Sequence, residues 1–273
     1  MNRILFITPV MHLRNFYSYV LQNYRVLELI NPTYEDVKLH ISKFDILFCA
    51  PNYQTFIIDE DLIKDSNVKY ILSPSTGLNH IDVNSIPIVS VKNDKILTDV
   101  WSTAEHTLYL MLSIVRGKHE LHDKTLGIIG YGRLGKMVEQ LCKPIFKKII
   151  SVDKNDNFDE LYKESDMVSI HMDLNDTTKN LIDSEFLSHF NKSIYLINTA
   201  RGEIVNEQDI KHLLSVGRLK GYATDVLQSE YNGQESTFNG IPNVITTPHI
   251  AGTSIEAQEK TYKRVLEKYE NIK

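Results

Sequence analysis

The stretch Thr125-Leu-Gly-Ile-Ile-Gly130-Tyr-Gly-Arg-Leu-Gly135 carries three glycines in the pattern Gly-x-Gly-x-x-Gly directly after a short apolar run. The run predicts a buried strand, and the residues from Leu134 to Leu141 follow at helical spacing. In such a unit the first glycine makes a tight turn, the second lets the backbone approach a pyrophosphate, and the third lets helix and strand pack closely. A dinucleotide site is therefore predicted, with the candidate residues Gly130, Gly132, Arg133, Leu134 and Gly135.

An acidic residue at the end of the next strand favours a dinucleotide site over an ordinary glycine-rich turn. Asp153 closes the predicted strand Lys148–Asp153 and lies 18 residues after Gly135. A carboxylate at that place accepts hydrogen bonds from ribose hydroxyls and repels a 2′-phosphate. NAD is therefore the expected cofactor and is favoured over NADP, even with Lys154 alongside.

Strand and helix patterns alternate on both sides of this unit. Apolar runs separated by amphipathic stretches predict parallel strands covered by helices on both faces of a sheet. A long buried helix is expected over 102–116, and another over 207–215, with Asn206 as N-cap and Gly217 as the stop. The stretch 254–273 predicts one charged helix. The predicted strands are 4–7, 26–29, 46–49, 70–72 and 88–91 before the glycine stretch, and 167–171, 194–198, 221–225 and 244–247 after it.

The length of 273 residues exceeds one typical domain, so two α/β domains are expected. We predict one domain over 1–98, completed by 254–273, and another over 99–253. Apolar residues make up 42% and charged residues 24% of the chain, which is typical of a soluble globular protein. No stretch approaches the roughly 20 apolar residues of a membrane span. Because Met1 runs into a strand pattern without a secretory leader, a cytoplasmic location is expected.

The charge balance and the cysteine and histidine residues argue against a nucleic-acid-binding protein and against a metal site. The chain has 30 Lys and Arg against 35 Asp and Glu, with no basic stripe, so no nucleic-acid partner is expected. Cys49 and Cys142 stand in apolar surroundings and are predicted core residues. His119 and His122 have the spacing of two metal ligands on a helix. With no third ligand nearby, however, they are predicted to be solvated, and no metal is expected.

Six short phrases follow one another along the chain. They are Gly77-Leu-Asn-His-Ile-Asp82, Ser102-Thr-Ala-Glu-His106, His171-Met-Asp-Leu-Asn-Asp-Thr-Thr178, Ile197-Asn-Thr-Ala-Arg-Gly202, Asp225-Val-Leu-Gln-Ser-Glu230 and Thr247-Pro-His-Ile-Ala-Gly252. In this order they resemble the D-isomer-specific 2-hydroxyacid dehydrogenase family, which includes D-lactate, glycerate and phosphoglycerate dehydrogenases. The resemblance covers about residues 70–255 and implies two doubly wound parallel-sheet domains, a Rossmann cofactor domain inserted into a smaller flavodoxin-like substrate domain. It also implies a homodimer. The chain departs from the family pattern at Asp173 and Tyr231, where proline is usual.

The chemistry of that family explains why three of these residue types occur together. Reduction of a 2-oxo acid places a hydride on the carbonyl carbon, while the oxygen gathers negative charge and takes a proton. The planar guanidinium of Arg201 can hold the carboxylate and polarise the carbonyl. Histidine is the usual proton donor near neutrality, so His249 is the expected general acid and base. Glu230 can orient that imidazole and favour its charged form, and the resemblance assigns the same three roles.

The resemblance implies further site residues. Those near the cofactor are His171, Thr178, Thr199, Ala200, Asp225 and Gly252. Those near the substrate are Asn52, Tyr53, Thr76 and Gly77, together with Arg201 and His249.

The substrate itself is expected to be a small 2-oxo acid or 2-hydroxy acid without a phosphate. The loop 50–56 lacks the arginine that phosphoglycerate-using members tend to place there. Burial of a phosphate without a cation costs several kcal/mol of lost hydration, so phosphohydroxypyruvate is disfavoured.

Two other functions share part of the pattern. An NAD-sensing binding protein has no chemical need for Arg201, Glu230 and His249 together. A Rossmann methyltransferase that uses S-adenosylmethionine also has a glycine-rich first turn, but these three residues have no role in it. The sequence therefore favours an NAD-dependent enzyme.

Overall fold

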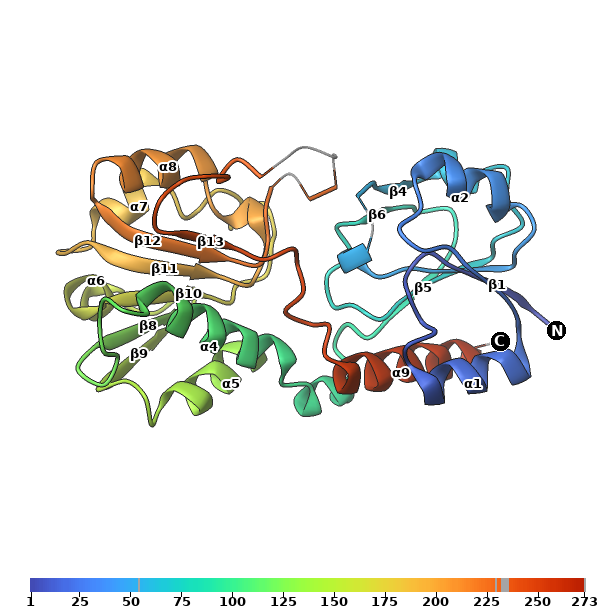
Figure 1. Cartoon of the computed structure of the whole chain (residues 1–273), viewed down its shortest axis with the longest axis horizontal. Coiled ribbons are helices and arrows are strands. Elements are labelled where there is room, and N and C mark those ends of the chain that lie inside the picture. The colour runs from blue at the N-terminus through green and yellow to red at the C-terminus, as the bar shows by residue number, and fades with distance from the viewer. Residues whose placement is uncertain (54, 229, 232–235, 273) are drawn as a thin grey trace. The chain divides into compact units, whose positions relative to one another are not determined.

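The computed structural model describes residues 1–53, 55–228, 230–231 and 236–272. The chain divides into two compact units, each with its own parallel sheet (Figure 1). The first unit comprises Met1–Val100, Glu230–Gln234 and Gly252–Lys273. The second comprises Trp101–Ser229 and Glu235–Ala251.

The first unit is built on a five-stranded sheet in the order β2-β1-β3-β5-β7, in which every pairing is parallel. When only the strands of this sheet are numbered along the chain, the order is 2-1-3-4-5, which is the flavodoxin-like arrangement. A short parallel pair, β4 and β6, lies apart from this sheet. The strands are β1 (Arg3–Phe6), β2 (Arg25–Glu28), β3 (Ile46–Phe48), β4 (Ile58–Asp59), β5 (Tyr70–Ser73), β6 (Ile81–Asp82) and β7 (Ile88–Ser90).

Helices cover both faces of this sheet. The apolar side chains of α1 and α9 share one core with the strands, and those of α2 and α3 form another (Figure 1). The C-terminal helix belongs to the first of these cores, because the Tyr262 ring centroid lies 5.6 Å from that of Phe16 and 5.1 Å from that of Phe48. The helices are α1 (Arg14–Asn23), α2 (Tyr34–Ile41), α3 (Glu60–Ile63) and α9 (Ile255–Ile272), with short 3-10 turns at η1 (Pro51–Tyr53) and η2 (Lys95–Asp99).

The second unit is built on a six-stranded parallel sheet in the order β13-β12-β11-β10-β8-β9. The strand order reverses between β8 and β10. In open α/β sheets, ligands bind at the carboxyl ends of the strands beside such a reversal. The strands are β8 (Thr125–Ile129), β9 (Lys148–Val152), β10 (Met167–Ile170), β11 (Ile194–Asn198), β12 (Leu219–Thr224) and β13 (Val244–Thr246).

Helices again cover both faces, with α4 and α5 on one core and α6, α7 and α8 on the other (Figure 1). The predicted bounds of α8 are confirmed: the Asn206 side chain accepts hydrogen bonds from two first-turn amides, and Gly217 just beyond the helix has φ +71°. The helices are α4 (Ser102–Val115), α5 (Arg133–Cys142), α6 (Asp159–Glu164), α7 (Ser184–Ser188) and α8 (Glu207–Ser215).

One helix differs from the prediction. The stretch 102–116 is predicted to be a long buried helix, yet Leu112 is 45% exposed and Tyr109 is 54% exposed on α4. The buried residues Ala104, Thr107 and Met111 recur at three- and four-residue spacing and face the sheet. That face leaves Leu112 on the opposite side. The pair β4–β6 was also not predicted, because two-residue strands carry no readable periodicity.

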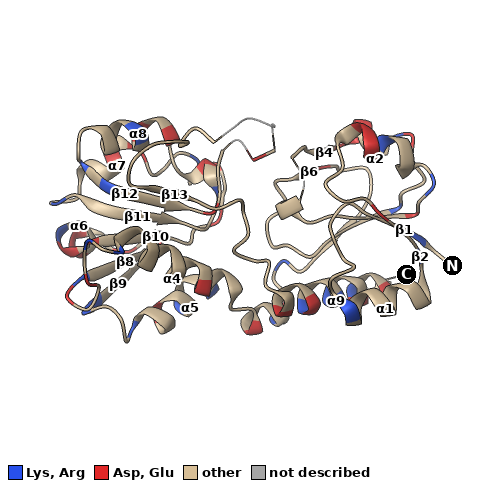
Figure 2. Ribbon diagram, viewed as in Figure 1, with Lys and Arg blue, Asp and Glu red and all other residues tan. Residues whose placement is uncertain are grey.

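The predicted fold class, two parallel-sheet α/β domains, is confirmed. Cys49 and Cys142 are fully buried, as expected of core residues. Lys and Arg occur together with Asp and Glu in each of the two units (Figure 2). Among the residues that the structure describes, no helix is long and apolar enough to cross a bilayer.

Candidate active site

The glycine loop joins β8 to α5 and has the geometry that a pyrophosphate needs. Gly130 has φ +94°, and a Cβ there would lie 2.7 Å from the backbone of His171. A Cβ at Gly135 would lie 2.3 Å from the Gly130 carbonyl oxygen. At Gly132, the N-cap of α5, an added Cβ meets nothing within 4 Å. The two outer glycines are thus required by packing, whereas Gly132 leaves open space at a helix amino end, where an anion is favoured.

Asp153 lies where a ribose-binding carboxylate is expected, directly after β9 at the same sheet edge. Its side chain is exposed and accepts a hydrogen bond from the Lys154 amide at 2.9 Å. The Asp153 amide donates to the Asp156 carboxylate at 2.7 Å. Two carboxylates therefore stand at the end of β9, which opposes a further phosphate at this position.

His171 follows β10, across the strand-order reversal from the glycine loop. Its Nε2 lies 2.8 Å from the Ser169 hydroxyl, and its Nδ1 is buried with no partner among the described residues. Burial lowers the pKa of His171 to about 3, so the ring is neutral at physiological pH. The loop after it closes through Thr178, whose hydroxyl donates to the Asp173 carbonyl at 2.7 Å. Asp173, at the family's usual proline position, thus takes part in an ordered loop.

Arg201 follows β11 in a loop that Asn198 holds from inside the sheet. The buried Asn198 side chain donates to the Arg201 carbonyl at 2.9 Å and accepts from the Ala200 amide at 3.0 Å. Thr199 is also buried and lies 2.8 Å from Thr107 through the two hydroxyls. These contacts fix the backbone on both sides of Arg201, whose own side chain is half-buried.

Close packing brings this loop beside the chain that leaves β12. A Cβ at Gly202 would lie 2.1 Å from the carbonyl carbon of Leu227. Only glycine fits there without a backbone shift, so Gly202 is needed for the approach of the two loops.

Asp225 organises the turn that carries His249. This carboxylate, at the end of β12, is 1% exposed and accepts from the Thr247 hydroxyl at 2.6 Å and from the Ile250 and Ala251 amides at 2.8 Å each. His249 sits inside the turn with φ +54°, a left-handed conformation that a histidine seldom adopts without support. The predicted cofactor residue Asp225 therefore also holds the predicted acid and base in place.

His106 on α4 extends this network. Its Nε2 lies 3.0 Å from the Thr247 hydroxyl and 3.5 Å from Asp225. Because that hydroxyl gives its proton to Asp225, it must accept from His106, which sets the tautomer. Burial lowers the pKa of His106, while the Asp225 charge acts in the opposite direction. The sequence shows His106 within a family phrase, but its spacing from Asp225 gives no sign of the contact.

The predicted substrate residues of the first unit gather at the carboxyl edge of its sheet. Asn52 and Tyr53 lie in η1 after β3, and Thr76 and Gly77 follow β5. The second loop is held by a chain of side chains: Ser75 donates to the Gly77 carbonyl at 2.8 Å and contacts Ser73 at 2.7 Å, and Ser73 lies 3.2 Å from His80. Nothing in the sequence pattern of residues 73–80 indicates this support.

A known protein family matches the part of the chain that carries the glycine loop, Arg201 and His249. The model of the family described as D-isomer specific 2-hydroxyacid dehydrogenase, NAD binding domain, matches residues 109–251, which is more than half of the chain. The chain belongs to this family. It is an NAD-dependent dehydrogenase, and the open space at Gly132, at the amino end of α5, leaves room for the pyrophosphate of NAD.

Individual relatives show how far the likeness to this dehydrogenase extends. A glyoxylate reductase from Thermofilum pendens is 30% identical over an alignment of 270 positions, which covers 84% of this chain and 78% of the relative. A D-specific alpha-keto acid dehydrogenase from Enterococcus faecium is 29% identical over 75% of this chain and 76% of its own length. The solved NAD complex of an NAD-dependent formate dehydrogenase from Staphylococcus aureus superposes with a TM-score of 0.82, covering 99% of this chain and 96% of that one, at 26% identity.

Glu230 and Gly252, predicted to act with residues of the second unit, belong to the first unit of the dehydrogenase. Glu230 is half-buried and Gly252 is exposed. The pairing of Glu230 with His249, and the contact of Gly252 with the cofactor, remain predictions.

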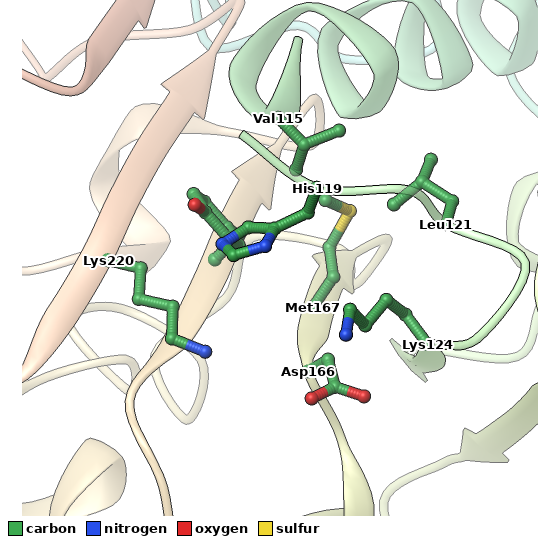
Figure 3. Close-up of a pocket in the computed structure, with 8 residues that line it drawn as sticks. Val115, His119, Leu121, Lys124, Asp166, Met167 and Lys220 are labelled. Carbon is green, nitrogen blue, oxygen red and sulfur yellow. The ribbon is translucent and has the colours of Figure 1, made fainter. Parts of the chain in front are cut away.

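A hollow in the second unit is lined by residues that are not among the predicted site residues (Figure 3). Its lining includes Met167 and Lys220, which stand at the amino ends of β10 and β12. The exposed His119 also borders it and packs against Tyr195 with ring centroids 5.9 Å apart. Arg201 and His249 lie at the opposite, carboxyl edge of the sheet, so this hollow is separate from the predicted catalytic residues.

Proposed function

We propose that this dehydrogenase interconverts a small D-2-hydroxy acid and the matching 2-oxo acid. Bound NAD(H) supplies or accepts the hydride. His249 donates a proton to the carbonyl oxygen during reduction and removes it during oxidation. Arg201 holds the carboxylate and polarises the carbonyl, and Glu230 orients the imidazole and favours its charged form. The sensing function without turnover is set aside, because the family match is to dehydrogenases.

The observation that carries the proposal is the placement of Arg201 and His249 at one sheet edge. Arg201 follows β11 and His249 follows β13, and β12 between them supplies Asp225, the support of the His249 turn. The glycine loop after β8 opens at the same edge. A fixed cation and a proton donor beside a cofactor loop are the groups that carbonyl reduction requires.

The same groups favour a 2-oxo acid over formate, although several relatives are named formate dehydrogenases. Oxidation of formate to carbon dioxide releases a hydride and needs no proton transfer at the substrate oxygen. A supported His249 has a clear use only where a carbonyl oxygen is protonated.

A substrate without phosphate is proposed from the loop after β3. Among its described residues, 50–53 and 55–56, there is no lysine or arginine. A dianionic phosphate buried there would lack a counter-charge from this loop.

We assign the substrate to the domain 1–98 with 254–273, and the cofactor to the domain 99–253. We further propose a homodimer in the cytoplasm. The exposed Tyr109 and Leu112 on α4 supply apolar surface for an interface, and the reduced, buried Cys49 and Cys142 suit a reducing compartment. Sedimentation equilibrium tests the dimer, and a monomer at micromolar concentration contradicts it.

The experiment that tests the function is a substrate panel. Pyruvate, hydroxypyruvate, glyoxylate, branched 2-oxo acids and phosphohydroxypyruvate are each supplied with NADH, and formate with NAD, while the reduced-nicotinamide absorbance is followed. Loss of absorbance with an unphosphorylated 2-oxo acid is expected. Turnover of formate alone, or a clear preference for phosphohydroxypyruvate, contradicts the proposal.

A further inference from the structure

A buried glutamine joins three elements at the carboxyl edge of the first unit's sheet. Gln258, in the first turn of α9, is 3% exposed. Its Nε2 lies 3.0 Å from the hydroxyl of Tyr53 in η1 and 3.4 Å from that of Tyr262. Its Oε1 lies 2.9 Å from Nε2 of His12, in the loop after β1. A polar side chain so deeply buried needs partners for its amide, and these three groups supply them.

The direction of these hydrogen bonds determines what Tyr53 can offer to a ligand. The amide nitrogen donates to both phenol oxygens, and the amide oxygen accepts from His12. Burial raises the pKa of Tyr262, so this phenol keeps its proton and can share it with the Thr8 hydroxyl at 3.3 Å. Tyr53 accepts from Gln258 and has no acceptor for its own proton among the described residues. Its hydroxyl is therefore available as a donor.

We infer that Gln258 is a positioning residue that holds the Tyr53 hydroxyl as a hydrogen-bond donor toward an oxygen atom of the substrate. Tyr53 lies at the sheet edge where ligands of open α/β sheets bind, and it is half-buried. The acceptor is either a carboxylate oxygen, present in every 2-oxo acid, or a hydroxyl on C3, present in hydroxypyruvate and absent from pyruvate. This inference rests on the proposed function.

The test uses Tyr53→Phe, Gln258→Glu and the double variant. The first removes the donated proton. The second is isosteric but replaces the donating nitrogen by a carboxylate oxygen, which accepts the Tyr53 proton and turns it away from the substrate. Glu259→Gln, on the next residue of α9, is the matched control. KM and kcat are measured with NADH against pyruvate and hydroxypyruvate, and NADH affinity is measured by fluorescence.

Each single variant is expected to raise KM about tenfold, the effect of one hydrogen bond to a substrate oxygen, while kcat and NADH affinity change less than about twofold. The double variant should be no worse than either single one, because both remove the same interaction. Equal losses with both substrates identify the carboxylate as the acceptor, and a loss confined to hydroxypyruvate identifies the C3 hydroxyl.

Unchanged KM in Tyr53→Phe overturns the inference, as does a double variant whose losses multiply to about a hundredfold. If Gln258→Glu does not fold, Tyr53→Phe still decides whether the donor exists. Failure of the proposed function is recognised separately, because the wild-type protein would then reduce no 2-oxo acid. In that case the affinity of the NADH complex for oxamate, a pyruvate mimic, provides the same comparison without turnover.

Discussion

Gly132→Ala should weaken NADH binding without disturbing the fold, because a methyl group there meets open space in the protein. The backbone at Gly132 has φ −77° and ψ −156°, which alanine adopts without strain. Nothing in the described chain lies within 4 Å of the added Cβ. The remaining cost is the poorer N-cap, about 1 kcal/mol. The methyl does, however, occupy the space through which a pyrophosphate approaches α5.

Overpacking by one methyl group costs about 1–3 kcal/mol, which corresponds to a rise of about 5- to 150-fold in the dissociation constant of NADH. Gly135→Ala is the matched control with the opposite expected pattern. Its Cβ would lie 2.3 Å from the Gly130 carbonyl oxygen, a contact that forces the backbone to move. The free energy of unfolding should therefore fall by more in Gly135→Ala than in Gly132→Ala.

Urea denaturation and fluorescence titration with NADH measure the two quantities. The expected result is a Gly132→Ala protein that is nearly as stable as wild type and binds NADH weakly. Wild-type affinity in a folded Gly132→Ala protein would refute the placement of the pyrophosphate at this loop.

Four further outcomes are expected. His249→Asn should lower kcat by about 10²- to 10⁴-fold with NADH affinity retained, and unchanged turnover removes it from the mechanism. Asp153→Ala should narrow the preference for NADH over NADPH in parallel titrations, and a wild-type protein that prefers NADPH contradicts the cofactor assignment. Asp225→Ala leaves the Ile250 and Ala251 amides without an acceptor, at a cost of about 1–3 kcal/mol each, so the free energy of unfolding in urea and kcat should both fall. Wild-type values of both quantities contradict a role of Asp225 in holding the His249 turn. In the unfolded chain His171 binds a proton near pH 6.5, whereas in the folded protein burial lowers its pKa to about 3. The free energy of unfolding should therefore fall as the pH drops from about 6.5 toward 3. His171→Gln should lose less stability over that range, and an identical pH dependence contradicts the burial argument.

Local signals in the sequence predicted most of the secondary structure. The runs at 4–7, 46–49 and 194–198 are apolar without alternation, and each lies in a strand buried on both faces of a parallel sheet. Helix α8 was predicted with its bounds because Asn206 and Gly217 act on the neighbouring backbone and need no distant partner. The spacing of the glycines likewise predicted the turn between β8 and α5.

Placement at a sheet edge was also readable. A residue that directly follows a parallel strand lies at the carboxyl edge whatever the packing around it, and Arg201 and His249 follow the predicted strands 194–198 and 244–247. The sequence did not predict which side of α4 is exposed, because apolar residues occur on both faces of the helix. Only the position of the sheet shows which face is covered.

The tertiary structure alone decided which side chains support the site. Asp225 meets amides 25 and 26 residues away, and Gln258 meets Tyr53 across 205 residues. Gly202 is required only because the chain after Leu227 passes over it. A buried carboxylate or amide takes whichever donors the fold brings within about 3 Å, and no sequence spacing specifies that choice. The sequence by itself determined the residue types for cofactor and proton chemistry and the strand ends that carry them. The contacts of Asp225 and Gln258 exist only once each sheet has assembled, because their hydrogen bonds join segments that are distant along the chain.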